Sequence, residues 1–142
     1  MPNLPFAAAA LGTALVLAAL ALAGVPGATD HACSQGIVSR LYLGQSTPAG
    51  AVTEPEWRDF VAQAVTPRFP DGFTEVRAHG RWRDERGQSV EEATRIVEIA
   101  HDDAQRLHER VRAIAADYRR RFAQQSVLVT QSRAVQCFDH GV

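Results

Sequence analysis

The sequence contains no lysine: its 15 basic residues are all arginine, against 16 acidic residues and a formal net charge of −1. A lysine nucleophile or Schiff base is therefore excluded. The near-neutral charge gives no electrostatic reason to expect nucleic acid or an acidic membrane surface as a partner. The P-loop, G-x-G-x-x-G, H-E-x-x-H and EF-hand patterns are also missing, and no serine lies in a G-x-S-x-G context. No complete catalytic or cofactor motif is present, so we expect no cofactor and no resident metal.

The N-terminus has no charged side chain before Asp30, and residues 7–25 are almost wholly apolar. Small residues follow at Gly24, Gly27 and Ala28, which is typical of a signal-peptidase site. We expect residues 1–27 to be a signal peptide that forms a helix. The alternative is an uncleaved membrane anchor, because about 18 apolar residues can span a bilayer.

Either reading exports the folded part, to the periplasm or the extracellular space, and limits membrane contact to the N-terminal segment. The 142 residues leave room for one domain after that segment. We expect a flexible segment over 28–36, one α+β domain over 37–138 and a tail over 139–142.

The first half of the domain predicts a strand over residues 37–43 and then a helix. Thr53 and Glu56 form a capping box, and Pro55 is tolerated in the first helical turn. Trp57, Phe60, Val61 and Ala64 then recur at the spacing of one apolar helix face, and we expect this face to pack into the core. Proline at position 67 ends the helix.

The stretch 66–83 predicts a fixed turn that leads into a strand. Two prolines and an Asp-Gly pair shape the turn, and residues 73–82 alternate strictly in polarity. One face carries Thr74, Val76, Ala78, Gly80 and Trp82, and the other carries Glu75, Arg77, His79 and Arg81. We expect the first face, with Trp82, to be buried and the second to be the open face of an antiparallel sheet.

The second half predicts a returning strand over 91–100, a helix that begins at Asp102 and Asp103, and a last strand over 126–138 interrupted or bulged near Gln131 and Ser132. The order is strand, helix, strand, strand, helix, strand. One antiparallel four-stranded sheet with both helices on one face accommodates every apolar stripe. This two-layer sandwich matches the ferredoxin-like βαββαβ motif, in which the first and last strands pair.

The only two cysteines test that topology. Cys33 precedes the first strand and Cys137 ends the last one, so the proposed sheet makes them neighbours. Outside the cytoplasm an even cysteine count predicts a disulfide. The alternative is a zinc site of His31, Cys33, Cys137 and His140, and we favour the disulfide because exported cysteines oxidise readily.

His79 is the candidate general base, because it lies between Arg77 and Arg81 on the polar strand face. The alternative is a solvated histidine. Arg68 and Asp71 bracket a Phe-Pro pair and are expected to pair across the turn; otherwise Arg68 joins Arg77, His79 and Arg81 in an anion clamp. Tyr118 is expected to be a core residue with its hydroxyl at the edge, not an acid catalyst.

Several motifs resemble a known family. They are Leu-Tyr-Leu-Gly at 41–44, Glu-Trp at 56–57, Thr-Pro-Arg-Phe-Pro-Asp-Gly at 66–72, Gly-Arg-Trp at 80–82 and Tyr-Arg-Arg-Arg-Phe-Ala-Gln-Gln-Ser-Val at 118–127. Over residues 41–138 the chain is similar to the bacterial exported family catalogued as domain of unknown function thirty-five seventy-four. The resemblance implies a small exported bacterial domain, and it carries over no catalytic residue.

Two hypotheses about function follow. The first is a non-catalytic envelope module whose open sheet face, with its polar residues Glu75, Arg77, His79 and Arg81, binds an unknown protein or small molecule; ferredoxin-like domains often cover that face by dimerising, so a homodimer is a further expectation. The second is a small enzyme for an anionic small molecule, with His79 as base and Arg68 or Arg81 holding the substrate.

Overall fold

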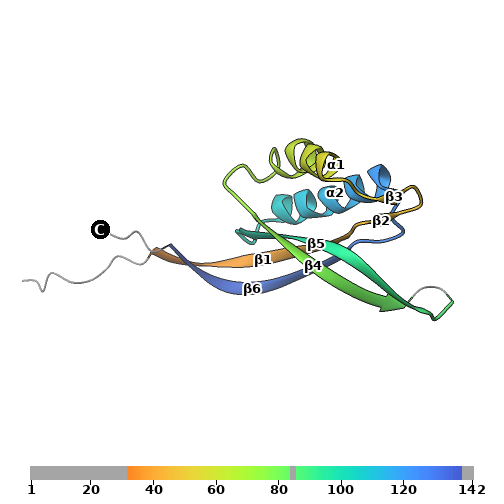
Figure 1. Cartoon of the computed structure of the whole chain (residues 1–142). Coiled ribbons are helices and arrows are strands. Elements are labelled where there is room, and N and C mark those ends of the chain that lie inside the picture. Colours follow the sequence, from red (N-terminus) through yellow and green to blue (C-terminus); the bar gives the residue numbers. More distant parts are fainter. Residues whose placement is uncertain (1–31, 84–85, 139–142) are drawn as a thin grey trace, which may run out of the picture.

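Two helices cover one face of a four-stranded sheet (Figure 1). The computed structural model describes residues 32–83 and 86–138. The sheet strands are β1 (Ala32–Gly44), β4 (Thr74–Arg83), β5 (Ser89–His101) and β6 (Leu128–Phe138), and a small hairpin is formed by β2 (Ser46–Thr47) and β3 (Gly50–Ala51). The helices are α1 (Glu54–Phe60), continued by the π-helical turn η1 (Val61–Val65), and α2 (Gln105–Arg121).

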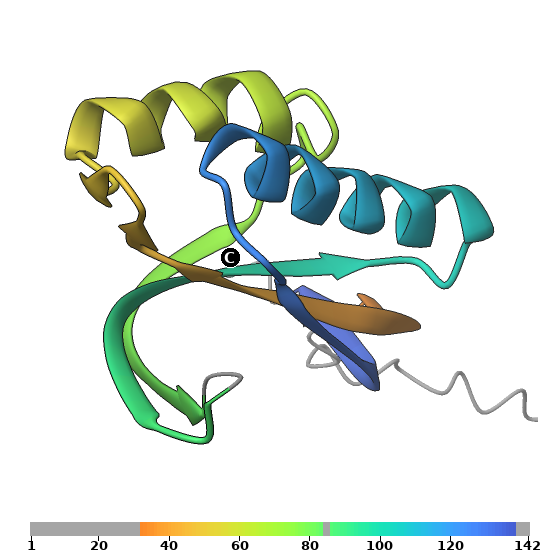
Figure 2. The ribbon, with the colours of Figure 1, turned by 90° about the vertical axis from the view of Figure 1, so that its right-hand side faces the viewer.

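The strand order in the sheet is β4-β5-β1-β6, and every neighbouring pair is antiparallel. The first and last strands are therefore adjacent, as expected, and both helices lie on the same side (Figure 2). The β1–β6 pair and the β4–β5 hairpin extend beyond the helix layer at opposite ends (Figure 1). The predicted α+β class, with one antiparallel four-stranded sheet and two helices, is confirmed.

The start of α1 follows the predicted capping box. The Thr53 hydroxyl accepts a hydrogen bond from the Glu56 amide, and the Glu56 carboxylate accepts one from the Thr53 amide at 2.8 Å. These bonds satisfy amide groups that have no partner inside the helix. The helical run ends at Val65, because Pro67 cannot continue it.

An aromatic cluster connects α1 and α2, the two helices that cover the sheet. The Phe60 ring packs edge-on against Tyr118 at 5.0 Å between centroids, and Tyr118 lies 4.7 Å from Phe122. Trp57 packs beside them and is buried, as predicted. The sheet contributes buried aliphatic side chains from its two central strands, Leu41, Leu43, Val97 and Ile99. Burial of such side chains is the main stabilising contribution to the fold.

The faces of β4 are the reverse of the prediction. Glu75 is the register partner of buried Val97, so Glu75, Arg77, His79 and Arg81 lie on the helix side of the sheet. Val76 and Trp82 lie on the open face, where Trp82 is 43% exposed, so its assignment to the core is wrong. The reason is that β4 is an edge strand whose far half extends past the helices, so its more apolar face need not be the covered one.

Three element boundaries also differ from the predictions. β1 begins at Ala32, so residues 32–36, expected to be flexible, pair with β6 instead. β6 is continuous through Gln131 and Ser132, which pair with Ser39 and Val38 without the expected bulge. α2 begins at Gln105, not at Asp102, because the Asp103 carboxylate binds the His108 ring instead of capping the helix.

The two cysteines form the predicted disulfide. Cys33 and Cys137 are register partners on β1 and β6, with 2.13 Å between their sulfur atoms. The alternative of a zinc site is wrong for Cys33 and Cys137, because their sulfur atoms are bonded to each other. The other two proposed ligands, His31 and His140, lie outside the described residues.

The predicted signal peptide at 1–27 and the tail at 139–142 also lie outside the described residues. Within residues 32–83 and 86–138, no helix is long and apolar enough to cross a membrane.

Candidate functional site

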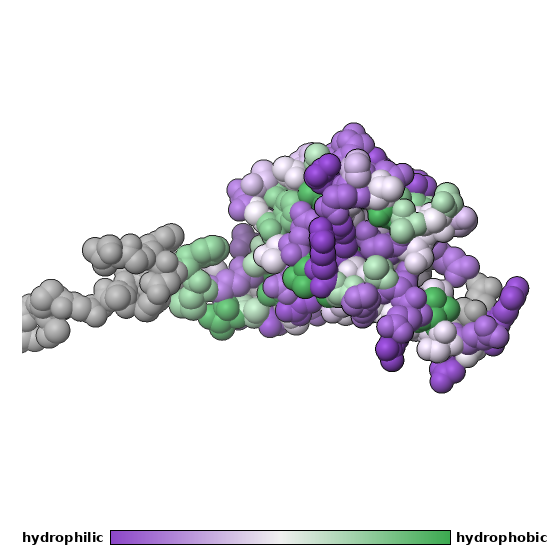
Figure 3. Space-filling model, in the orientation of Figure 1, coloured by the Kyte–Doolittle hydropathy of each residue, from purple (hydrophilic) through white to green (hydrophobic). Residues whose placement is uncertain are grey.

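A hollow of about 330 Å³ opens between the β2–β3 hairpin and the helix side of β4 and β5. We call it the arginine hollow. Its lining consists of Gln45, Ala51, Val52, Arg77, Ala78, His79, Ala93, Thr94 and Arg95. The side of the molecule that faces the viewer in Figure 1 is largely hydrophilic (Figure 3). The polar part of this lining includes two guanidinium groups, those of Arg77 and Arg95.

Arg95 is held in a fixed position beside the hollow. Its guanidinium forms an ion pair with Glu54, and its central carbon lies 4.8 Å from the centroid of the Trp57 ring. Only 14% of the side chain is exposed. Stacking on an aromatic ring and pairing with a carboxylate restrict the rotamers of an arginine, so less entropy is lost when it binds an anion.

Arg77 lies opposite Arg95 on the neighbouring strand and shares its carboxylate partner. An Arg77 nitrogen lies 3.4 Å from the same Glu54 oxygen, while 79% of the Arg77 side chain is exposed. The hydrogen bond from Arg95, supported by the positive charges of Arg95 and Arg77, lowers the pKa of Glu54. Two guanidinium groups therefore share one Glu54 oxygen at the rim, and a second carboxylate, Glu75, lies on the same face of β4, where it accepts a hydrogen bond from the Trp57 ring.

His79 lines the hollow next to Arg77 and is exposed. Within the described part of the chain its ring makes no hydrogen bond and has no carboxylate to orient it. A general base normally has such a partner to fix its tautomer and position. The structure thus brings His79 to a cationic hollow but does not give it the environment of an activated base.

The base of the hollow is fixed by a hydrogen-bonded chain at the end of β1. The Gln45 side-chain amide donates to the Leu43 carbonyl at 2.9 Å and to the Tyr118 hydroxyl at 2.8 Å. That hydroxyl donates to the Gly44 carbonyl at 2.7 Å. Burial raises the pKa of Tyr118 above its usual range. Tyr118 is in the core, as expected, but the prediction that its hydroxyl lies at the edge is wrong, because the whole side chain is buried.

The remaining predicted binding residues lie elsewhere. Arg68 pairs with Asp117 of α2 at 2.7 Å and not with Asp71, which lies exposed in the turn. Arg81 pairs with Glu91 farther along the β4–β5 hairpin at 3.2 Å. The structure thus brings together Arg77 and His79 of the predicted clamp, whereas Arg68 and Arg81 do not line the hollow.

Sequence reasoning missed Arg95, Glu54 and Gln45. Arg95 is the only arginine in the strand run 89–101, which is the one signal that marks it in the sequence. Its pairing with Arg77 depends on strand register, and its contact with Glu54 joins positions 41 residues apart.

A second polar cluster, also missed, links β1, β6 and the start of α2. Buried Ser39 lies with its hydroxyl 2.7 Å from His101 Nε2 and accepts a bond from the Gln131 amide at 2.8 Å. The Gln131 oxygen then faces His108 Nδ1 at 3.1 Å, and His108 Nε2 faces Asp103 at 2.8 Å. The Gln131 oxygen and the Asp103 carboxylate can only accept hydrogen bonds, so both ring nitrogens of His108 donate and the ring carries two protons.

The charge on His108 agrees with its surroundings. Hydrogen bonds to Asp103 and then to Gln131 raise the pKa of His108, and the bond from His108 lowers the pKa of Asp103. The ring nitrogen of His101 that faces the Asp102 carbonyl at 2.7 Å must donate, which leaves Nε2 to accept from Ser39. Because Ser39 is fully buried, we interpret this cluster as structural. In the described ranges, no group of three or more His, Cys, Asp or Glu side chains is arranged to hold a metal.

Comparison with known proteins places the chain in a family and a fold. The model of the family described as "Protein of unknown function (DUF3574)" matches residues 38–138. No curated protein matches. A phage SAM lyase in complex with S-methyl-5'-thioadenosine is similar in structure, with a TM-score of 0.57 and 20% identity over 74% of this chain and 90% of that one. The apo state of a phage SAM lyase gives a TM-score of 0.50 and 21% identity, over 75% and 90%. At these identities the likeness shows a shared fold.

Proposed function

We propose that this chain, which belongs to the DUF3574 family of proteins of unknown function, is a non-catalytic binding module that holds a small anionic ligand at the arginine hollow. One observation carries the proposal: Arg77 and Arg95 share a single carboxylate, Glu54. An incoming carboxylate or phosphate accepts hydrogen bonds from the fixed guanidinium of Arg95 and the exposed guanidinium of Arg77, which share this one ion-pair partner. The volume of about 330 Å³ is at the lower end for small-molecule sites.

The module is exported in this proposal, to the periplasm or the extracellular space. The Cys33–Cys137 disulfide is consistent with an oxidising compartment, and the apolar N-terminal segment over 1–27 supports export from the sequence. The strand order β4-β5-β1-β6 supports classing the fold as ferredoxin-like. A homodimer through the open sheet face stays a proposal, supported by exposed Val76, Trp82 and Leu128 on that face.

The binding proposal is tested by calorimetric titration of the full chain with inorganic phosphate as the probe. Arg77→Ala removes an exposed cation from the rim and is expected to weaken binding about tenfold, equivalent to about 1.4 kcal/mol. Arg83→Ala is the matched control, since Arg83 is on the same strand and does not line the hollow. Equal affinities for the two variants, or no binding of phosphate, would contradict the proposal.

The second candidate is a small enzyme in which His79 removes a proton from an anionic substrate. The position of His79 beside two arginines favours it. SAM carries a net positive charge, but it has a carboxylate that the arginines can bind, and the shared fold with a phage SAM lyase makes it the first substrate to test. The full chain is incubated with SAM, and released S-methyl-5'-thioadenosine is measured by chromatography. Release that is lost in His79→Ala would establish the enzyme and overturn the non-catalytic module; no release alongside measurable binding favours the module.

A further inference from the structure

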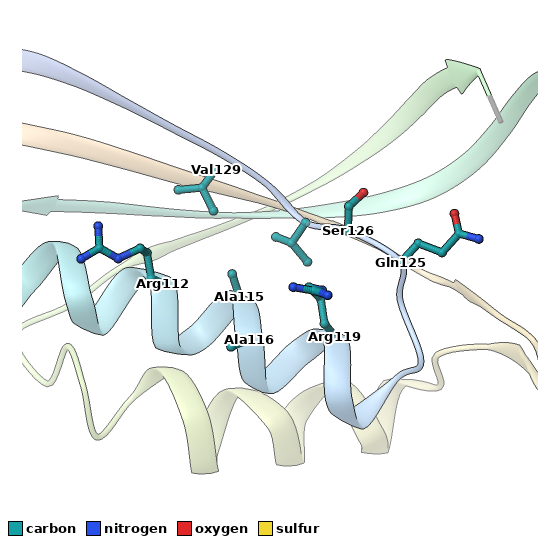
Figure 4. Close-up of a pocket in the computed structure, with 8 residues that line it drawn as sticks. Arg112, Ala115, Ala116, Arg119, Gln125, Ser126 and Val129 are labelled. Atoms are coloured by element: carbon teal, nitrogen blue, oxygen red, sulfur yellow. The ribbon is translucent and has the colours of Figure 1, made fainter. Parts of the chain in front are cut away.

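A second hollow, of about 340 Å³, lies between α2 and the beginning of β6 (Figure 4). We call it the α2–β6 groove. Ala115 and Ala116 of α2 line one wall, and Val127 and Val129 line the other. The small alanine side chains on α2 leave room beside the strand. The two alanines and the two valines together form the apolar floor of the groove.

The strand that borders this groove has an unpaired edge. β6 pairs with β1 on one side, and no strand of the described chain pairs with its other side. The backbone N–H and C=O groups on that side are therefore available to an added strand. A groove between an edge strand and a helix is the geometry in which extended peptides bind by strand addition.

Two arginines flank the apolar floor. Arg112 and Arg119 project from α2 on either side of the two alanines (Figure 4). Neither has a carboxylate within ion-pair distance in the described ranges, whereas Arg120 and Arg121 of the same helix pair with Asp117 and Asp59. The groove thus holds two cations that the rest of the fold leaves without a counter-charge.

We propose that the α2–β6 groove binds an extended acidic peptide segment of another protein, which adds as a fifth strand along β6 and directs carboxylates to Arg112 and Arg119. The two arginines are seven residues apart, which is about 10.5 Å along a helix axis. Side chains on one face of a strand recur every ~6.8 Å, so a segment with acidic residues at alternate positions places carboxylates within reach of both long side chains.

A second copy of the chain fits the groove less well than an acidic peptide. β6 itself contains Arg133 and no carboxylate, so two copies paired edge to edge through β6 would bring cations together without neutralising Arg112 or Arg119. The proposed site is also separate from the arginine hollow, since no residue lines both. It therefore goes beyond the function proposed above and does not depend on it.

The test uses fluorescence anisotropy of the full chain with a fluorescein-labelled octapeptide in which Glu and Val alternate. We expect saturable binding, weakened at least tenfold in R112A/R119A. The matched control is R58A/R106A, which removes two exposed arginines outside the groove and is expected to bind within about twofold of the parent chain. Equal weakening by both pairs, or equal binding of a Lys-Val octapeptide, overturns the proposal in favour of non-specific attraction.

Strand addition is tested separately by N-methylation of the peptide. Alternate amides of a strand point to opposite edges, so methylation at all Val or at all Glu positions blocks one edge each. We expect one form to lose binding and the other to keep it; retention or loss in both overturns strand addition. Light scattering tests whether a second copy of the chain occupies the groove. A parent chain that is dimeric without peptide and becomes monomeric in R112A/R119A overturns the proposal in favour of a second copy.

Discussion

Cys33 and Cys137 lie directly opposite each other on neighbouring strands and join positions 104 residues apart. The crosslink connects the β1–β6 pair near the end that extends past the helices. It therefore ties together the first and last strands of the sheet, where the helix layer gives no support.

Reduction of this disulfide is expected to lower the free energy of unfolding by up to about 4–5 kcal/mol, because a crosslink over so long a loop restricts the unfolded chain strongly. Urea denaturation with and without reductant measures the difference. The double variant C33S/C137S serves as the control and is expected to be insensitive to reductant. A parent chain equally stable in both conditions would contradict the assignment.

The pH dependence of stability is expected to reflect His108. Its folded-state pKa is raised above 6.5, so its stabilising contribution is fully present below pH 6.5 and is lost as the pH rises through the raised value. Its partner Asp103 has a lowered pKa, so that contribution is present above pH 3.8 and is lost as the pH falls through the lowered value.

Urea denaturation between pH 5 and pH 9 checks this expectation for His108. The decline in stability above pH 6.5 is expected to shrink in His108→Gln, and in Asp103→Asn the histidine pKa measured by NMR is expected to fall. Parallel stability profiles for the parent chain and His108→Gln would rule out the contribution.

Tyr118→Phe is expected to lower the free energy of unfolding by about 1–3 kcal/mol, because the substitution leaves the Gly44 carbonyl and the Gln45 amide without their partner. Tyr42→Phe is the matched control on the open sheet face and is expected to change stability by less than about 0.5 kcal/mol. In absorbance titration, one of the two tyrosines should resist ionisation until the protein unfolds. Ionisation of both in the folded protein near pH 10 would contradict the buried hydroxyl.

The reversed faces of β4 are tested by the two tryptophans. Trp57 is buried and donates to Glu75 at 2.5 Å, so Trp57→Ala is expected to cost about 3–5 kcal/mol. Trp82 is partly exposed on the open face, so Trp82→Ala is expected to cost about 1 kcal/mol or less. Both are measured by thermal or urea denaturation. Similar large losses for the two variants would restore the sequence-based assignment of Trp82 to the core.

Much of the fold is encoded in local patterns. The Thr53–Glu56 capping box, the stop at Pro67 and the apolar stripe through Trp57 and Phe60 act within a few residues, so the sequence predicts α1 directly. Strand and helix order, together with two cysteines near the chain ends, was enough to predict that β1 and β6 pair.

The sites could be predicted only in part. Strand alternation predicted that Arg77 and His79 share one face of the strand, but it could not predict which face the helices cover. The contacts that complete the arginine hollow depend on where the start of α1 meets β5, as in the pairing of Arg95 with Glu54. Arg68 pairs with Asp117 of α2 and not with Asp71, its near neighbour in the sequence, because helix packing brings Asp117 within reach.

By itself the sequence determined the four long strands, the two helices, their order and the disulfide between the first and last strands, because caps, turns and apolar periodicity operate over a few residues; it did not predict the β2–β3 hairpin. Only the tertiary structure decided which arginines share a carboxylate and which strand edge stays open. Both depend on strand register and on the reach of the helices across the sheet, and these are set by packing between residues far apart in the chain.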